Sequence, residues 1–190
     1  MRGWYRRTES EMHALSYGKM AANIKKYFYA LPAGAFIVDI GSMDINGTYR
    51  PLIEPHWRYY GIDLAAGLNV DLVMRSEFDT GLPADSADAV LCGQCLEHCR
   101  DPFRLMVEAV RIAKPGAVLL VTAPFIWAEH RHPLDCWRFL PDGMRVLLEQ
   151  AGAECLEAYV VGDDEKGSRT DGQVNGTDCW GIGRKKSWTP

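Results

Sequence analysis

The sequence predicts an α/β domain built on a mostly parallel, doubly wound sheet. Short apolar segments alternate with segments of helical periodicity, which is typical of parallel strands joined by helices. In addition, two aspartates, Asp39 and Asp63, stand at the ends of the first two strands, where ligands bind in such sheets. The seven predicted strands cover residues 35–40, 58–63, 70–74, 87–92, 117–123, 153–161 and 178–183.

Three segments carry the signals of helices. Residues 8–11 (Thr-Glu-Ser-Glu) offer a capping box ahead of an amphipathic helix that runs to about Leu31. A second helix is predicted over 101–113, where an Asp-Pro pair starts it and a Lys-Pro-Gly turn ends it. A third covers 141–151 and is closed by Gly152.

The connections predict a trimmed version of this architecture, with fewer helices on one side. Residues 64–69 alone separate the second and third strands, whereas a parallel crossover normally needs about a dozen. Residues 75–86 are also short for a helix, and 162–177, rich in Gly, Asp and Ser, predict an exposed loop. We expect one domain over 1–190, with residues 1–33 as a helical cap on a core of 34–190.

The composition is that of an ordinary globular protein. The 190 residues are 47% hydrophobic and 24% charged, and the apolar run 117–128 is too short to span a bilayer. No signal peptide follows the N-terminal arginines, so we expect a cytoplasmic protein without a membrane partner. A net charge of −4 with scattered basic residues gives no footprint for nucleic acid, and the sequence leaves the oligomeric state open.

Three of the six cysteines, Cys92, Cys95 and Cys99, are closely spaced around His98. A zinc or iron–sulfur site is conceivable, but no second paired cluster completes four ligands. The run lies where a buried strand passes into a loop, and reduced cysteine packs there as a small hydrophobic residue. We therefore assign no metal to it.

The strand-end aspartates predict a nucleotide-like ligand in a Rossmann-like domain. Gly41 follows the first strand and allows a tight backbone turn, while the Asp63 carboxylate is placed to accept ribose hydroxyls. Either aspartate alone is equally well explained as a helix cap or a turn former. Together they favour an adenosyl ligand.

Five segments, in order, resemble motifs of the class I S-adenosylmethionine-dependent methyltransferases, and specifically of the methyltransferase type 11 group. They are residues 38–42, 61–64, 82–92, 96–102 and 114–121. The resemblance covers nearly all of the chain and implies a seven-stranded sheet with an antiparallel last strand, S-adenosylmethionine as cofactor, and methyl transfer. Met43 departs from the family pattern, because it stands where the next glycine would be.

The resemblance also implies which residues bind the cofactor. Asp39 would meet the amino group, and Asp63 both ribose hydroxyls, with Leu64 packed on adenine. The other expected contacts are Gly41 and Ser42 through their backbone, Asn46 in the same loop, Phe78 and Asp79 at the adenine edge, and Gly93 and Gln94 beside the sulfonium. Glu97 and His98 are expected to organise the start of a helix rather than to do chemistry.

Residues 46–50 and 132–139 resemble a bacterial subgroup often associated with sugar or secondary-metabolite pathways. This implies a small-molecule or glycan acceptor, and we expect O-methylation, although no residue pattern selects oxygen over nitrogen or carbon. His132 is the candidate general base and Asp135 the residue that orients it. Two alternatives stay open: His132 hydrogen-bonds only backbone, or His130, His132 and Asp135 bind a divalent cation that polarises a diol.

Aromatic and basic residues are the candidates for the acceptor pocket. Trp137 and Arg138 would form its wall, with Arg138 clamping an acidic group, and Tyr17 would contribute from a helical lid. Each is equally well explained by packing or by an internal ion pair.

Two other functions compete with methyl transfer on this fold. A nicotinamide-dependent oxidoreductase is disfavoured because no G-x-G-x-x-G follows the first strand and the chain has no Tyr-x-x-x-Lys pair. A non-catalytic domain that binds an adenosyl ligand stays open, because the acceptor side is poorly defined by sequence.

Overall fold

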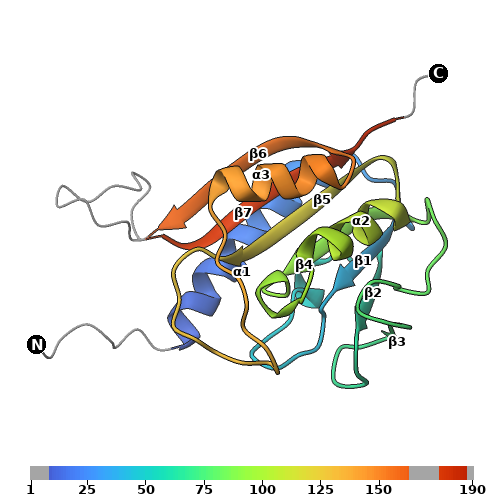
Figure 1. The fold of residues 1–190 in the computed structure, drawn as a ribbon. Coiled ribbons are helices and arrows are strands. Elements are labelled where there is room, and N and C mark those ends of the chain that lie inside the picture. The colour runs from blue at the N-terminus through green and yellow to red at the C-terminus, as the bar shows by residue number, and fades with distance from the viewer. Residues whose placement is uncertain (1–8, 163–175, 188–190) are drawn as a thin grey trace, which may run out of the picture.

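The computed structural model describes residues 9–162 and 176–187 of the chain (Figure 1). Its helices are α1 (Glu9–Tyr27), α2 (Pro102–Ile112) and α3 (Pro141–Gln150), with 3-10 turns η1 (Arg50–Leu52) and η2 (Leu96–His98). Its strands are β1 (Phe36–Ile40), β2 (Arg58–Asp63), β3 (Leu72–Val73), β4 (Ala87–Gly93), β5 (Ala113–Pro124), β6 (Ala153–Gly162) and β7 (Gly176–Lys185). Each predicted strand and helix is present, with ends that differ by a few residues.

The strands form one mixed sheet in the order β3-β2-β1-β4-β5-β7-β6. β1 to β5 pair in parallel, whereas β7 runs antiparallel between β5 and β6. This confirms the Rossmann-like sheet with an antiparallel last strand. Because β7 runs the other way, its first residues lie beside the end of β5, with Asp178 opposite Pro124.

Helices cover both faces of the sheet, with α2 and α3 on one face and α1 on the other (Figure 1). Successive strand residues point to opposite faces, so Val38 packs towards α2 and α3 while Ile37 packs towards α1. α2 begins where predicted, because the Asp101 side chain accepts a hydrogen bond from the backbone N–H of Arg104 at 3.1 Å.

The β3 side of the sheet is trimmed, as expected. Within the described residues, the segments joining β1 to β4 contain the turn η1 and loops but no α-helix. β3 is shorter than the predicted 70–74, and the Asp71 side chain accepts the N–H of Gly61 at 2.8 Å and pairs with Arg50 at 2.6 Å.

Some expectations lie outside the described residues, namely Thr8 of the capping box and residues 163–175 of the predicted exposed loop. None of the described helices combines the length and the apolar character needed to cross a bilayer.

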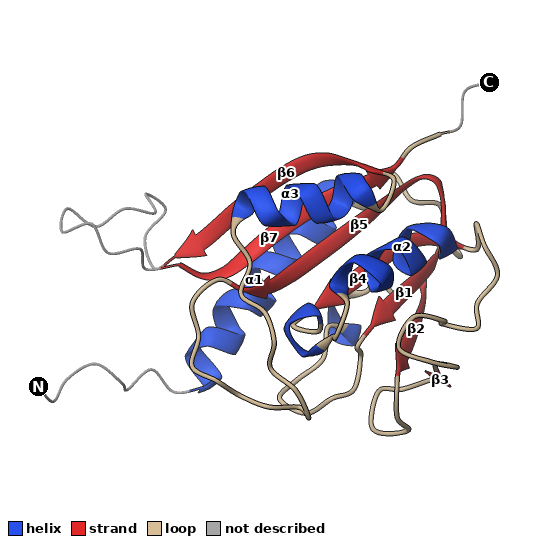
Figure 2. Cartoon of the chain, viewed as in Figure 1, coloured by secondary structure: helices blue, strands red, loops and turns tan. Residues whose placement is uncertain are grey.

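The carboxyl ends of β1, β2, β4 and β5 lie at one edge of the sheet, and long loops extend from it (Figure 2). The loop of residues 125–140, between β5 and α3, and the loop after β1 are the longest there. This edge holds the candidate site, as ligand sites in open α/β sheets generally do.

Candidate functional site

A cavity of about 580 Å³ opens at the carboxyl edge of the sheet. Its wall includes the end of β1 and the following loop, Asp63 to Ala65 after β2, the segment from Gly93 to Cys99, and part of the 125–140 loop. Eight of the predicted cofactor residues line it: Asp39, Gly41, Ser42, Asn46, Asp63, Leu64, Gly93 and Gln94. The sheet topology therefore brings these residues together around the cavity.

Asp63 ends β2 and ties the loop after β1 to the sheet. One carboxylate oxygen, Oδ2, accepts the backbone N–H of Met43 at 3.0 Å, and the other, Oδ1, accepts that of Leu64 at 2.7 Å. An ionised carboxylate offers about four acceptor sites. Asp63 therefore keeps capacity for two further donors from the cavity, such as a pair of hydroxyls.

Asp39 is buried in β1, with 3% of its surface exposed. The hydroxyl of Tyr59 donates to its Oδ2 at 2.5 Å, and the amide of Asn69 donates to that hydroxyl at 2.9 Å. Burial raises the pKa of Asp39 to about 7, although the Tyr59 hydroxyl and the nearby Arg50 charge act to lower it. A cation in the cavity would favour the ionised form.

The turn after β1 depends on Gly41, which has a φ of +76°. A Cβ at this position would lie 2.6 Å from Cys95, so the turn also packs against the segment after β4. The N–H groups of Gly41 and Ser42 both donate to the carbonyl of Ile62, at 2.9 and 3.1 Å. These N–H groups thus hold the turn on β2, and the expected approach of the Gly41 and Ser42 backbone to the cofactor stays a prediction.

Gly93 and Gln94 leave β4 in a constrained conformation. A Cβ on Gly93 would lie 2.4 Å from the ring of Tyr49, and Gln94 has a φ of +54°. The side chains of Gln94 and Ser16 hydrogen-bond Asp178, whose pKa burial raises to about 6.

Sequence reasoning missed Asp178 and Ser16, which both line the cavity. The signal for Asp178 was its place at the start of a strand that runs antiparallel, since that end meets the carboxyl edge of its neighbours. Tyr17, the expected lid residue, does not belong to the cavity wall, whereas its neighbour Ser16 does. The helix predicted as a lid thus reaches the cavity through a different residue.

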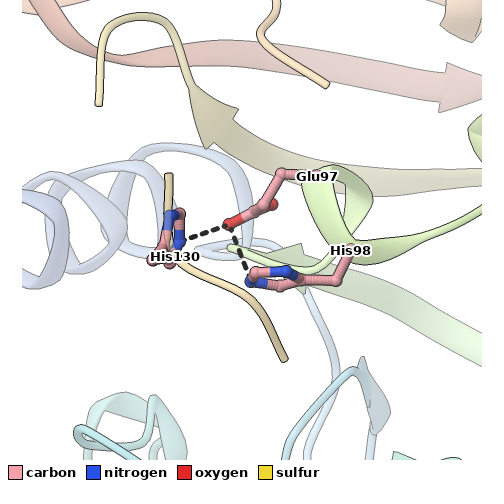
Figure 3. A group of neighbouring side chains, drawn as sticks. All are labelled: Glu97, His98 and His130. Atoms are coloured by element: carbon pink, nitrogen blue, oxygen red, sulfur yellow. Dashed lines mark ion pairs between the residues drawn. The ribbon is translucent and has the colours of Figure 1, made fainter. Parts of the chain in front are cut away.

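Glu97 of η2 is a fully buried carboxylate on the cavity wall. Its Oε1 lies 3.7 Å from Nε2 of His98 and 3.9 Å from Nε2 of His130, and all three side chains converge (Figure 3). Within the described ranges, neither Glu97 oxygen has a hydrogen-bond partner. Burial raises the pKa of Glu97 to about 8 and lowers that of His98. We expected Glu97 and His98 to organise a helix start, but they face the cavity.

The predicted catalytic pair is arranged differently from our expectation. His132 lines the cavity, but Asp135 accepts the backbone N–H of His130 at 2.7 Å and lies 3.4 Å from the His130 ring nitrogen Nδ1. Asp135 also forms a two-pronged ion pair with Arg138, at 2.6 and 2.8 Å. The carboxylate therefore orients His130 rather than His132.

The two expected wall residues, Trp137 and Arg138, instead form hydrogen bonds within the protein. Arg138 donates to Asp135 and to the carbonyls of Trp127 and Ala128, which leaves its guanidinium engaged. Trp137 donates from Nε1 to the carbonyl of Cys99 at 2.8 Å. Neither residue belongs to the cavity wall, and their hydrogen bonds hold the 125–140 loop in place.

Phe78 and Asp79 also lie outside the cavity wall. The Arg104 guanidinium stacks 4.1 Å from the Phe78 ring, and Asp79 accepts the N–H of Gly81. Their neighbour Glu77 does line the cavity. The turn is thus in the expected region, but a different side chain faces inwards.

Part of this sequence matches a known domain family, and known structures share this fold. Residues 38–121, from β1 to β5, match the family described as methyltransferase domain. None of the curated protein sequences matches the chain.

Three solved structures share the fold at low sequence identity. A S-adenosylmethionine-dependent methyltransferase from Aquifex aeolicus is 17% identical, with a TM-score of 0.60 and coverage of 86% of this chain and 88% of that one. One from Archaeoglobus fulgidus is 15% identical, with a TM-score of 0.64 and coverage of 89% and 94%. The cyclase SpnF is 17% identical, with a TM-score of 0.68 and coverage of 97% and 85%.

The domain match covers the strands that carry Asp39 and Asp63 and the turn after β4 that carries Gln94. The strand order and the acidic strand ends agree with it. Residues 38–121 thus match a methyltransferase domain, and the chain as a whole has the fold of S-adenosylmethionine-dependent methyltransferases.

Proposed function

We propose that the protein transfers a methyl group from S-adenosylmethionine to a hydroxyl oxygen of a small molecule or glycan. The observation that supports this is a cavity whose wall contains two chemically distinct groups of residues. Acidic residues at the ends of β1 and β2 form one part of its wall, and the histidines of η2 and the 125–140 loop form another. The first part suits a cofactor, and the second suits removal of a proton from an acceptor.

The cavity fits the donor in size and in the chemistry of its wall. Its volume of about 580 Å³ lies within the range of about 300–1,000 Å³ that is usual for small-molecule sites. S-adenosylmethionine supplies a methyl group that is already activated by a sulfonium charge. In our proposal Asp63 accepts the ribose hydroxyls, Leu64 packs on the adenine, and Asp39 faces the amino group.

The acceptor part of the proposal concerns the proton. When a hydroxyl oxygen forms its bond to the methyl carbon, the carbon–sulfur bond breaks and the hydroxyl proton must leave. His132 lines the cavity and is exposed, so it can take this proton and release it to solvent. His132 thus stays the candidate base, but without the support of Asp135.

Isothermal titration calorimetry with S-adenosylmethionine and with NAD tests the cofactor half of the proposal. We expect S-adenosylmethionine and its demethylated product to bind and NAD not to bind. Preferential binding of NAD would contradict the proposal.

Release of the demethylated product in the presence of phenols, sugars with free hydroxyls, and amines tests the acceptor half. We expect turnover with hydroxyl compounds and its loss in His132→Ala, with cofactor affinity unchanged. Turnover with amines alone would refute oxygen as the acceptor, and a wild-type rate in His132→Ala would exclude it as the base.

A further inference from the structure

We propose that Glu97, His98 and His130, which line the cavity, bind a divalent first-row transition-metal ion. Their three ligand atoms lie within 4.8 Å of one another and come from two segments, η2 and the 125–140 loop (Figure 3). The metal site itself goes beyond methyl transfer. Only its effect on an acceptor, given below, rests on the proposed function.

The first argument is the unsatisfied carboxylate. Glu97 is 0% exposed, and neither oxygen has a hydrogen-bond partner among the described residues. Leaving a buried polar group without a partner destabilises a protein, and more strongly when the group is charged. Native proteins rarely carry such a group without a reason, and a bound cation supplies one.

The second argument is the orientation of the two imidazoles. Nδ1 of His98 lies 2.6 Å from the carbonyl of Leu134, and Nδ1 of His130 lies 3.1 Å from the carbonyl of Ala128. A carbonyl only accepts, so each Nδ1 carries the proton and each Nε2 presents a lone pair. Both Nε2 atoms face Glu97. Metal-binding histidines generally have this arrangement, with the second nitrogen donating to a carbonyl or carboxylate.

The three ligand atoms lie somewhat farther apart than they would around a bound ion. Ligand atoms about 2.0–2.2 Å from a common metal lie roughly 3–3.5 Å from one another. Oε1 of Glu97 is 3.7 Å from Nε2 of His98 and 3.9 Å from Nε2 of His130. Shifts of a few tenths of an ångström would bring these two pairs to that spacing. The two Nε2 atoms lie within 4.8 Å of each other, so the imidazoles would have to approach one another by up to about 1.5 Å.

The surrounding loop is built to hold this geometry. The backbone N–H of Cys136 donates to the carbonyl of Glu97 at 2.7 Å, and Asp135 accepts the N–H of His130. Arg138 in turn fixes Asp135 by its two-pronged pair. Arg138, expected to bind substrate, and Asp135, expected to orient the base, thus support the three ligands.

The ligand set selects the kind of metal. Two imidazole nitrogens and one carboxylate suit zinc, cobalt, iron or manganese, whereas magnesium prefers an all-oxygen set. Three protein ligands leave at least one position open to the cavity. If the protein methylates hydroxyls, an acceptor oxygen in that position would lose its proton more easily, as metal-bound water does.

Cobalt(II) and zinc(II) titrations of the chelator-treated full-length protein test the proposal. We expect one equivalent to bind, with the visible absorption of four- or five-coordinate cobalt, and zinc to displace it. His130→Gln should weaken binding by at least about tenfold. Because His130 lies on a loop and is partly exposed, this variant should keep the fold, which circular dichroism checks.

Matched controls separate this proposal from the rest of the site. His56→Gln changes an exposed histidine outside the cavity and should leave metal binding unchanged. Glu97→Gln keeps the shape of the buried side chain and should abolish binding. Absence of cobalt binding, or equal binding in wild type and His130→Gln, would overturn the proposal. S-adenosylmethionine titrated into the same samples reports on the cofactor site independently.

Discussion

Asp63 and Asp39 differ in what surrounds their carboxylates, and this gives them different expected roles. Asp63 is half-buried and held by two backbone N–H groups, whereas Asp39 is buried and bonded by one phenol. The former keeps acceptor positions open for neutral donors such as hydroxyls. The latter is suited to change its protonation when a cation arrives.

Replacing Asp63 by asparagine should weaken S-adenosylmethionine binding by about 1–3 kcal/mol, the scale of hydrogen bonds to a charged group. Calorimetry of the variant measures this. Asp142→Asn, at an exposed position in the first turn of α3, is the control and should bind like wild type. Equal affinity in both variants would place the ribose elsewhere.

Cofactor affinity should depend on pH through Asp39. Its pKa of about 7 in the free protein means that a cationic amino group must displace a proton below that pH. Affinity should then fall by up to about tenfold for each pH unit below about 7. Calorimetry at several pH values checks this. Asp39→Asn should bind more weakly at neutral pH but without this slope, and a flat profile in wild type would contradict the assignment.

Sequence reasoning succeeded at these two residues because a strand end places its side chain by topology alone. It failed at Glu97, His98 and His130, since their contact depends on how the 125–140 loop folds back on η2. Periodicity carries no information about that path. Three hydrogen bonds between loop and turn define it, and each involves at least one backbone atom.

At the scale of elements, the 125–140 loop behaves as part of the sheet edge rather than as a free connection. Arg138 and Asp135 tie it internally, and Asp135 has only 2% of its side chain exposed. The Arg138 guanidinium holds the pKa of Asp135 well below its usual range. This pair therefore stabilises the fold above the ordinary pKa of aspartate, near 4, and the contribution is lost as the pH falls below it.

Arg138→Gln should destabilise the protein by about 2–3 kcal/mol, because it leaves a buried carboxylate with less compensation. Denaturant unfolding at neutral pH measures the change. Arg131→Gln is the matched control, since Arg131 pairs with Glu129 while both are largely exposed, and it should cost less than about 1 kcal/mol. Similar losses in both variants would show that the loop contributes little to stability.

The elements themselves were predictable because each has strong local signals. Asp101 caps α2 and Pro141 begins α3, as the sequence indicates. The length of β3 was not predictable, because it depends on a side-chain contact. The Asp71 carboxylate accepts the backbone N–H of Gly61 in β2, ten residues earlier in the sequence. A hydrogen bond of this kind cannot be detected from the hydrophobic periodicity of the sequence.

At the scale of the whole molecule, the cavity gathers buried carboxyl groups whose pKa values are raised. Burial raises the pKa of Asp39 to about 7 and that of Asp178 to about 6. The folded protein thus holds protons that the unfolded chain releases above about pH 4. These groups stabilise the fold at low pH, and their contribution is lost as the pH rises through about 6–7.

The cofactor-free protein should therefore lose stability between about pH 5 and about pH 8, by at least about 1 kcal/mol. Thermal unfolding across this range checks it. The double variant Asp39→Asn with Asp178→Asn should reduce the dependence, and Glu97, whose pKa burial raises to about 8, should account for the part that remains. A wild-type stability that rises steadily up to pH 8 would contradict the burial of these groups.

The position of β7 sets an order for folding. β6 is synthesised before β7, yet within the described sheet its neighbour is β7, which also pairs with β5. During translation β6 therefore leaves the ribosome before the strand it pairs with, and the sheet is complete only after residue 185 has emerged. A chain that ends just before β7 would leave the edges of β5 and β6 unpaired. It would also lack Asp178, so the wall of the cavity would be incomplete.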